Sequence, residues 1–176
     1  WPGSDYETYD RLFASGLGGA ISWGNTESIR EVSAHAGRHQ VKFIEHGPKL
    51  GFVVVERPGE KEAKELAQAL ALDIVPWEQY ACLSPRLIFY LEGDVSLEAF
   101  AKMMAERLER VTQELPNPPM DYQRASTVTA NREYYLSTLE FQGKGSVYHS
   151  SDTSWTVVYG HTPPVKTDLN CTQGRF

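Results

Sequence analysis

The residues with the most chemistry to offer surround Cys82, in the segment Gln79-Tyr80-Ala81-Cys82-Leu83-Ser84-Pro85. This segment follows a helical pattern and precedes an apolar run of strand length, and such junctions contain active-site groups in many α/β folds. A cysteine thiolate attacks activated carbonyl carbons and forms thioesters. A single cysteine is also commonly a buried, inert thiol, so the residue alone leaves both interpretations open.

Two neighbouring side chains, Glu45 and His46, can transfer protons. A carboxylate serves as a general base, and an imidazole with an ordinary pKa of about 6.5 gains or loses a proton near neutral pH. The alternative is a solvent-exposed carboxylate at a sheet edge followed by a histidine in a turn. The sequence does not separate the two residues as proton carriers.

The segment Gly24-Asn25-Thr26 comes directly after a short apolar run and opens a helical pattern. Free N–H groups at a helix start attract phosphate, and glycine lets a ligand approach the backbone closely. The simpler interpretation is an ordinary helix cap. His35 and His39 are four residues apart, but no further ligand follows at metal spacing, so we predict no metal site.

The periodicity of apolar residues predicts the elements that position these groups. We expect helices at 6–13, capped by Ser4, and at 26–32, 60–74, 97–111 and 122–139, and strands at 20–23, 41–44, 52–55, 87–91, near 147 and at 155–159. Alternation of strands with helices indicates a layered α/β fold with a mainly parallel sheet.

Composition excludes several classes of protein. The 176 residues are 41% apolar, enough for a sizeable core, and the net charge of −6 without a basic run argues against nucleic-acid binding. Two cysteines far apart indicate a reducing compartment, and no stretch is apolar and long enough to span a bilayer. We therefore expect a cytoplasmic protein and, because the chain opens without Met, a piece of a longer polypeptide.

Three segments in fixed order resemble the aldehyde dehydrogenase superfamily: Trp23-Gly24-Asn25-Thr26-Glu27, Phe43-Ile44-Glu45-His46-Gly47-Pro48-Lys49 and Gln79-Tyr80-Ala81-Cys82. Their separations, 18 positions from Glu27 to Glu45 and 37 from Glu45 to Cys82, are similar to those between the superfamily's glycine turn, base segment and nucleophile. Within this superfamily, the sequence of these segments is most similar to the LuxC-type acyl reductases. Their Gln-x-Ala-Cys-x-Ser-Pro signature matches the Cys82 segment. Gln79 stands three residues before Cys82 rather than two, so the match to aldehyde-oxidising members is inexact.

The resemblance implies an aldehyde dehydrogenase-like, three-layer α/β fold. Residues 1–45 would end an NADP-binding domain, and residues 46–176 would form an incomplete catalytic domain. Cys82 would attack a long-chain acyl thioester and NADPH would reduce the resulting thioester to fatty aldehyde. Glu45 takes the place of the superfamily's general base with His46 as an equal alternative, and Gly24, Asn25 and Thr26 would contact the cofactor.

The same resemblance implies partners. The acyl donor would be a long-chain acyl-CoA or an acylated partner enzyme, with acyl-transferase and acyl-protein synthetase subunits as associates and homo-oligomers expected. The aldehyde would serve luminescence, wax formation or another aldehyde-consuming pathway. Two rival hypotheses remain: a cysteine hydrolase or transferase using Cys82 and His46 without a nicotinamide, and a non-catalytic assembly module with an inert cysteine.

Overall fold

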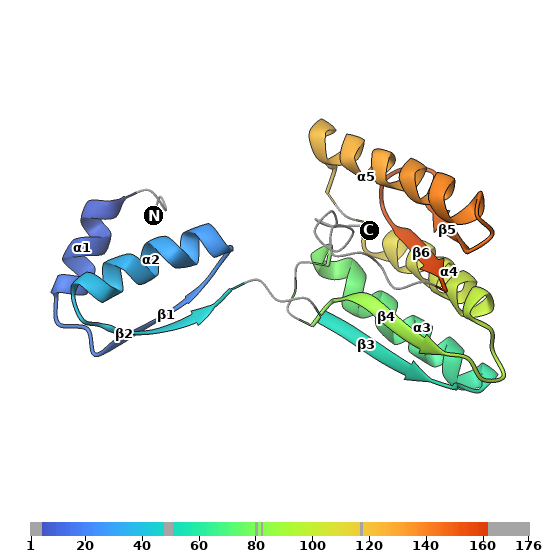
Figure 1. Cartoon of the computed structure of the whole chain (residues 1–176), viewed down its shortest axis with the longest axis horizontal. Helices are drawn as coiled ribbons and strands as arrows, with labels where there is room; N and C mark the ends of the chain where they lie inside the picture. The colour runs from blue at the N-terminus through green and yellow to red at the C-terminus, as the bar shows by residue number, and fades with distance from the viewer. Residues whose placement is uncertain (1–4, 48–50, 80, 82, 117, 162–176) are drawn as a thin grey trace. The chain divides into compact units, whose positions relative to one another are not determined.

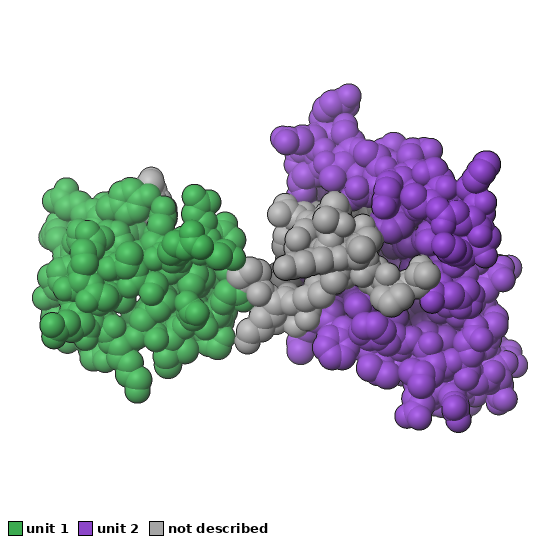
Figure 2. Space-filling view, in the orientation of Figure 1, with its two compact units in different colours: residues 1–49 green, residues 50–176 purple. Residues whose placement is uncertain are grey.

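The computed structural model describes residues 5–47, 51–79, 81, 83–116 and 118–161 (Figure 1). The chain divides into two compact units, Trp1–Lys49 and Leu50–Phe176 (Figure 2). Both units mix helices with strands, so the predicted α/β class is confirmed. In the described ranges the strands form three two-stranded sheets, two parallel and one antiparallel, where we expected one mainly parallel sheet. The predicted roles of residues 1–45 and 46–176 stay predictions.

The first unit consists of α1 (Tyr6–Ala14), β1 (Gly19–Trp23), α2 (Thr26–Arg38) and β2 (Lys42–His46). The two strands pair in parallel, with Gly19 opposite Lys42. Both helices lie over one face of this pair (Figure 1), where Ala20 and Phe43 pack against a small core of Phe13, Ala36 and Val41. Burial of this one apolar face holds the unit together.

Helix α1 begins at Tyr6 as predicted, but its capping residue differs from the predicted one. The N-cap is Asp5, whose carboxylate accepts hydrogen bonds from the Thr8 hydroxyl (2.7 Å) and the Thr8 N–H (3.1 Å). These bonds stabilise the charged form and lower the pKa of Asp5. The expectation of a Ser4 cap is therefore wrong: Ser4 itself lies outside the described residues, and a carboxylate satisfies the helix N-terminus as well as a hydroxyl does.

A polar cluster joins α1 to α2. The Asp10 carboxylate lies 2.7 Å from His35 Nδ1, 3.4 Å from His39 Nε2 and 3.7 Å from the Arg38 guanidinium. The hydrogen bond to His35 is the main cause of the lowered pKa of Asp10. The His35 ring is buried and stacks on Tyr6, with centroids 5.7 Å apart. The two histidines thus take part in a contact between helices.

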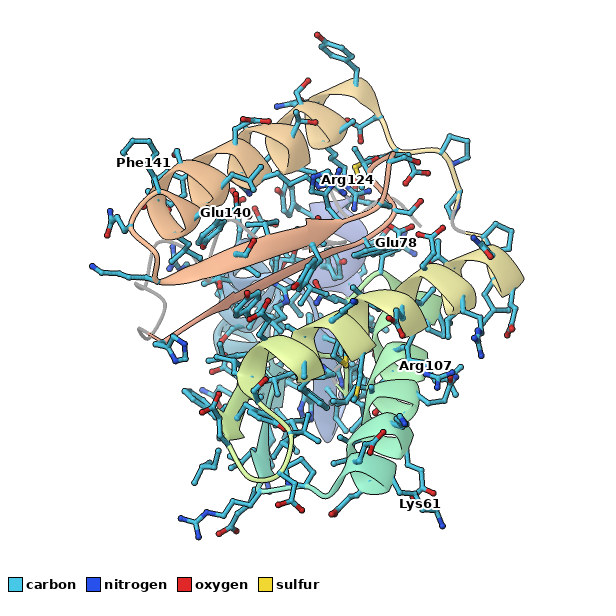
Figure 3. The ribbon with its side chains drawn as sticks, turned by 90° about the vertical axis from the view of Figure 1, so that its right-hand side faces the viewer. Lys61, Glu78, Arg107, Arg124, Glu140 and Phe141 are labelled. Atoms are coloured by element: carbon cyan, nitrogen blue, oxygen red, sulfur yellow. The ribbon has the colours of Figure 1, made fainter. Side chains whose placement is uncertain are left out.

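The second unit is built from β3 (Gly51–Glu56), α3 (Glu60–Ile74), the 3₁₀ turn η1 (Val75–Trp77), β4 (Pro85–Leu91), α4 (Leu97–Glu114), α5 (Tyr122–Tyr135), the π-helical turn η2 (Leu136–Glu140), β5 (Gly145–His149) and β6 (Thr156–Gly160). Strands β3 and β4 are parallel, whereas β5 and β6 form an antiparallel hairpin. The views in Figures 1 and 3 place the hairpin between α4 and α5.

Helix α4 lies at the centre of the second unit. Its apolar side, spaced at three and four residues, contributes Phe100, Met104 and Leu108, each at most 3% exposed, to the main core. Each such side chain stabilises the fold by about 1.5 to 3 kcal/mol. Phe100 also stacks on Tyr90 of β4 at 4.7 Å between centroids. No helix in the described part of the chain is long and apolar enough to cross a membrane.

The parallel pairs each leave one apolar face open. On β3 and β4, Phe52, Val54, Phe89 and Leu91 are 62%, 56%, 42% and 42% exposed, with Phe52 and Phe89 in edge-to-face contact. The outer face of β1 and β2 similarly exposes apolar side chains: Ile21, Trp23 and Ile44. Continuous apolar runs are typical of parallel strands buried on both faces. Each pair thus has the composition of a sheet that is buried on both faces. Within the described residues, only one of its faces is packed against other elements.

Candidate functional site

Two of the three predicted motifs meet at one edge of the first unit. Strand β1 ends at Trp23 and strand β2 at His46, and the parallel register sets Trp23 opposite His46 and Ser22 opposite Glu45. Because parallel strands end at the same edge, the turn Gly24-Asn25-Thr26 and the pair Glu45-His46 come together there. The structure therefore unites the predicted cofactor-contacting and proton-transfer residues.

Trp23 and His46 make direct contact at this edge. Their rings stack with centroids 5.1 Å apart and an angle of 9° between planes, and the Gly24 N–H donates to the His46 carbonyl at 3.4 Å. Trp23 remains 67% exposed. Strand β2 extends through His46, so the alternative that placed this histidine in a turn is wrong. The imidazole is instead oriented by a strand on one side and an indole face on the other.

Glu45 and His46 lie on opposite faces of the sheet. Side chains alternate along a strand, so Glu45 shares the side of Phe43, toward the helices, and His46 shares the open side of Ile44. A ligand bound against one face of this sheet meets one of the two side chains. The structure thus distinguishes the proton-transfer candidates by face, a distinction that adjacent positions in a sequence do not reveal until the strand is assigned.

The N-terminus of α2 has donors to offer. Asn25 is the N-cap, and its side-chain oxygen accepts the Ser28 N–H at 2.8 Å. The N–H groups of Thr26 and Glu27, in the first turn, have no acceptor within an α-helix. Asn25 and Thr26 are exposed. Open N–H groups at the positive end of a helix suit a dinucleotide phosphate, although the Glu27 carboxylate in the same turn is a like charge that a phosphate would meet.

Gly24 has no steric reason in the described structure to be glycine. A Cβ added there would lie 3.4 Å from Ser28 Cβ and 4.0 Å from Ile29 Cγ1, which is ordinary contact. Its φ is outside the left-handed range that favours glycine. A glycine that neither packing nor backbone conformation requires is consistent with close approach of a ligand to the turn. The residues at this edge therefore leave room for a ligand to approach the turn.

Cys82 itself lies outside the described residues, and the structure describes what leads to it. Helix α3 ends at Ile74, the turn η1 follows, and Glu78 and Gln79 then adopt φ values of 49° and 62°. Two consecutive non-glycine residues in the left-handed region cost about 1 to 3 kcal/mol each. Such strained backbone concentrates at functional sites.

The other side of the Cys82 segment is tied down by Ser84. This serine is 2% exposed, and its hydroxyl donates to the Asp73 carbonyl at 2.5 Å. Its N–H donates to the Ala81 carbonyl at 3.0 Å. Backbone on both sides of Cys82 is therefore fastened, and Ser84 is attached to the C-terminal turn of α3. The sequence indicated Ser84 only as part of the signature.

Gln79 bridges the ends of the segment. It is 7% exposed, its N–H donates to the Ile74 carbonyl at 3.1 Å, and its Nε2 donates to the Pro85 carbonyl at 3.4 Å. Its Oε1 is buried and has no hydrogen-bond partner among the described residues. The sequence motif contains Gln79 but indicates no role for it, because burial and hydrogen bonds between separate residues cannot be read from seven consecutive residues.

An ion pair connects the same region to α5. The Glu78 carboxylate, with its side chain 16% exposed, lies 3.5 Å from the Arg124 guanidinium (Figure 3). Glu78 is the first of the two left-handed residues. The strained entry to the Cys82 segment is thus fixed from α5 as well as from α3.

Arg132 of α5 is a buried residue that the sequence did not single out. It is 7% exposed, and its guanidinium donates to five groups of the hairpin: the hydroxyls of Thr156 (3.0 Å) and Ser150 (3.4 Å) and the carbonyls of Trp155 (2.9 Å), Ser150 (3.4 Å) and Asp152 (2.5 Å). Burial disfavours the charged guanidinium and lowers its pKa. This arginine organises the loop between β5 and β6.

Comparisons with known proteins agree with the motifs. The family model described as acyl-CoA reductase (LuxC) matches residues 1–175. The long-chain acyl-protein thioester reductases of Vibrio harveyi and Aliivibrio fischeri are 26% and 28% identical to this chain, over 90% and 92% of its length. One from Photobacterium leiognathi is 28% identical over 69% of the chain. The chain spans 31% and 32% of the first two relatives.

Proposed function

Since the chain belongs to the LuxC family of acyl-CoA reductases, we propose that it is the part of such an enzyme that forms a thioester on Cys82 and contributes to binding NADPH. The complete protein would reduce a long-chain acyl thioester to fatty aldehyde. The observation that supports this most strongly is the family match, which extends over residues 1–175 and includes both the Cys82 segment and the Gly24 turn.

The first half-reaction is acyl transfer. The Cys82 thiolate attacks the thioester carbonyl, a new sulfur–carbon bond forms, and the bond to the carrier thiol breaks. The carrier thiolate leaves and takes up a proton. The strained, fastened backbone on either side of Cys82 supports this role, because a nucleophile must be held in a near-attack geometry.

The second half-reaction is reduction of the acyl-enzyme. NADPH supplies the hydride when it is bound. With one proton, the Cys82 thioester becomes a thiohemiacetal, which collapses to the aldehyde and the free thiol. Glu45 or His46 would provide that proton, and the N–H groups of α2 at Thr26 would hold a cofactor phosphate.

The acyl donor is a carrier-bound long-chain acyl group. The relatives' name, acyl-protein thioester reductase, supports an acylated partner protein as the donor, and the family description supports acyl-CoA. Both present the same thioester to Cys82. An assembly with acyl-transferase or acyl-protein synthetase subunits, and with further copies of the protein, belongs to the same proposal.

The experiment uses the complete protein and a radiolabelled long-chain acyl-CoA. We expect a hydroxylamine-sensitive label on the wild type and on the control Cys171→Ser, and none on Cys82→Ser. Added NADPH should discharge the label as aldehyde. Label that persists in Cys82→Ser would refute the thioester, and release of free acid without NADPH would establish the rival cysteine hydrolase.

A further inference from the structure

The side chain of Gln79 links the two ends of the Cys82 segment. Its Nε2 bonds to the carbonyl of Pro85, six positions along the chain, while its own N–H bonds to Ile74 at the end of α3. In the reverse orientation of the amide, Gln79 Oε1 would face the Pro85 carbonyl oxygen, and two acceptors cannot form a hydrogen bond. Nε2 is therefore the atom that faces Pro85. One side chain thus ties the first residue of the segment to its last.

Two features of this arrangement destabilise the fold. Gln79 is in the left-handed region, its neighbour Glu78 is too, and its Oε1 is buried without a partner among the described residues. A buried unpaired acceptor and a strained backbone both destabilise a fold, and natural proteins retain them mainly where function requires them. An apolar side chain of the same length would remove the unpaired acceptor.

Gln79 is close to the proposed nucleophile Cys82 along the chain. Cys82 follows Gln79 by three positions, and three extended residues span at most about 11 Å. A hydrogen bond that joins Gln79 to Pro85 therefore limits the conformations open to the chain between them. Acyl transfer requires the reacting atoms in a narrow range of distance and angle, so loss of the bond between Gln79 and Pro85 should slow it.

We propose that Gln79 is a positioning residue for Cys82: its amide, bonded to Pro85, closes the segment and presents the thiol to the acyl thioester. The proposal rests on the function proposed above, because it presupposes that Cys82 is acylated. Gln79 touches neither the substrate nor the cofactor in this scheme and acts through the backbone of the segment.

The first test is Gln79→Met in the complete protein, with Gln123→Met, an exposed glutamine of α5, as the matched control. Methionine has similar length but neither amide atom. We expect the acylation rate constant to fall about tenfold or more with the KM for acyl-CoA unchanged. We expect thermal stability to change little, since the unpaired Oε1 is gone while the Pro85 carbonyl loses the Nε2 donor. Unchanged acylation, or a KM that rises while the rate constant stays, would overturn the proposal.

Gln79→Glu supplies a second, reversible test. A protonated carboxyl can donate to the Pro85 carbonyl as the amide does, whereas a carboxylate cannot. The acylation rate of this variant, divided by that of the wild type at each pH, should be low at pH 8 and rise as the pH falls through the pKa of the introduced carboxyl. The ionisable neighbours that the structure describes around this segment, Asp73, Glu78, Arg86 and Arg124, are the same in both proteins.

A ratio independent of pH would overturn the positioning role. The outcome is separable from that of the proposed function: if Cys82→Ser loses the label while both Gln79 variants acylate normally, the thioester stands and the role of Gln79 fails. If Cys82→Ser keeps the label, the function itself fails.

Discussion

Single buried polar side chains perform much of the organisation in the second unit. Gln79 joins the ends of the Cys82 segment, and Arg132 joins α5 to the loop between β5 and β6. Neither lies in an apolar stripe, and both direct their hydrogen bonds mainly to backbone carbonyls. Polar groups that are buried in this way specify one arrangement of the backbone, because any other arrangement leaves them unpaired.

Arg132 provides a prediction at this scale. In Arg132→Met the Thr156 hydroxyl and the Asp152 carbonyl lose a charged donor inside the fold, so we expect the free energy of unfolding to fall by about 2 to 4 kcal/mol. Equilibrium denaturation measures the loss. The exposed Arg110→Met is the control and should change stability by less than about 0.5 kcal/mol. Equal effects of the two substitutions would contradict the organising role of Arg132.

The predicted site residues occupy the ends of elements. Strands β1 and β2 end beside each other, and α2 begins directly beyond β1, so a helix N-terminus and two strand ends share one edge. Asn25 has two roles there, because it caps the helix and lies in the proposed phosphate-binding turn. The two roles respond differently to substitution.

Asn25→Ala removes the cap and should lower the free energy of unfolding by about 1 kcal/mol. Asn25→Asp keeps a capping oxygen and should retain stability, yet its negative charge beside the open N–H groups should weaken NADPH binding. Denaturation and NADPH titration by fluorescence, both on the complete protein, separate the effects. NADPH affinity unaltered in Asn25→Asp would place the cofactor phosphate elsewhere.

As a whole, the molecule consists of two units whose parallel strands each have one open apolar face. Phe52, Val54, Phe89 and Leu91 line this face in the second unit, and Ile21, Trp23 and Ile44 line it in the first. Neighbouring exposed apolar side chains often mark a surface that contacts another surface. The chain spans about a third of the length of the Vibrio harveyi and Aliivibrio fischeri relatives.

The open face of β3 and β4 predicts how the isolated chain behaves. We expect the 176-residue chain to bind an apolar dye such as ANS, and the double substitution Phe52→Thr with Phe89→Thr to reduce the dye fluorescence severalfold. Threonine retains the strand preference of these positions. Phe141→Thr, at a single side chain that is 94% exposed, is the control and should have little effect. Dye binding that survives the double substitution would show that this face is not the apolar surface responsible.

Most elements could be predicted from the sequence, because their periods are local. The spacing of Ala63, Ala67 and Leu70 predicts α3, and the run at 87–91 predicts β4. The first helix cap was misassigned to Ser4 because Ser4 and Asp5 are both capping types, and only the backbone shows which one accepts the Thr8 N–H.

The sequence by itself determined the α/β class, the places of nearly all helices and strands, and the motifs that assign the chain to its family, since these depend on neighbouring residues. Only the tertiary structure decided that Trp23 stacks on His46, that Glu45 and His46 face opposite sides, and that Gln79 closes the Cys82 segment. It also decided which sheet faces stay open. These features depend on strand register and on contacts between distant segments, which local spacing does not encode.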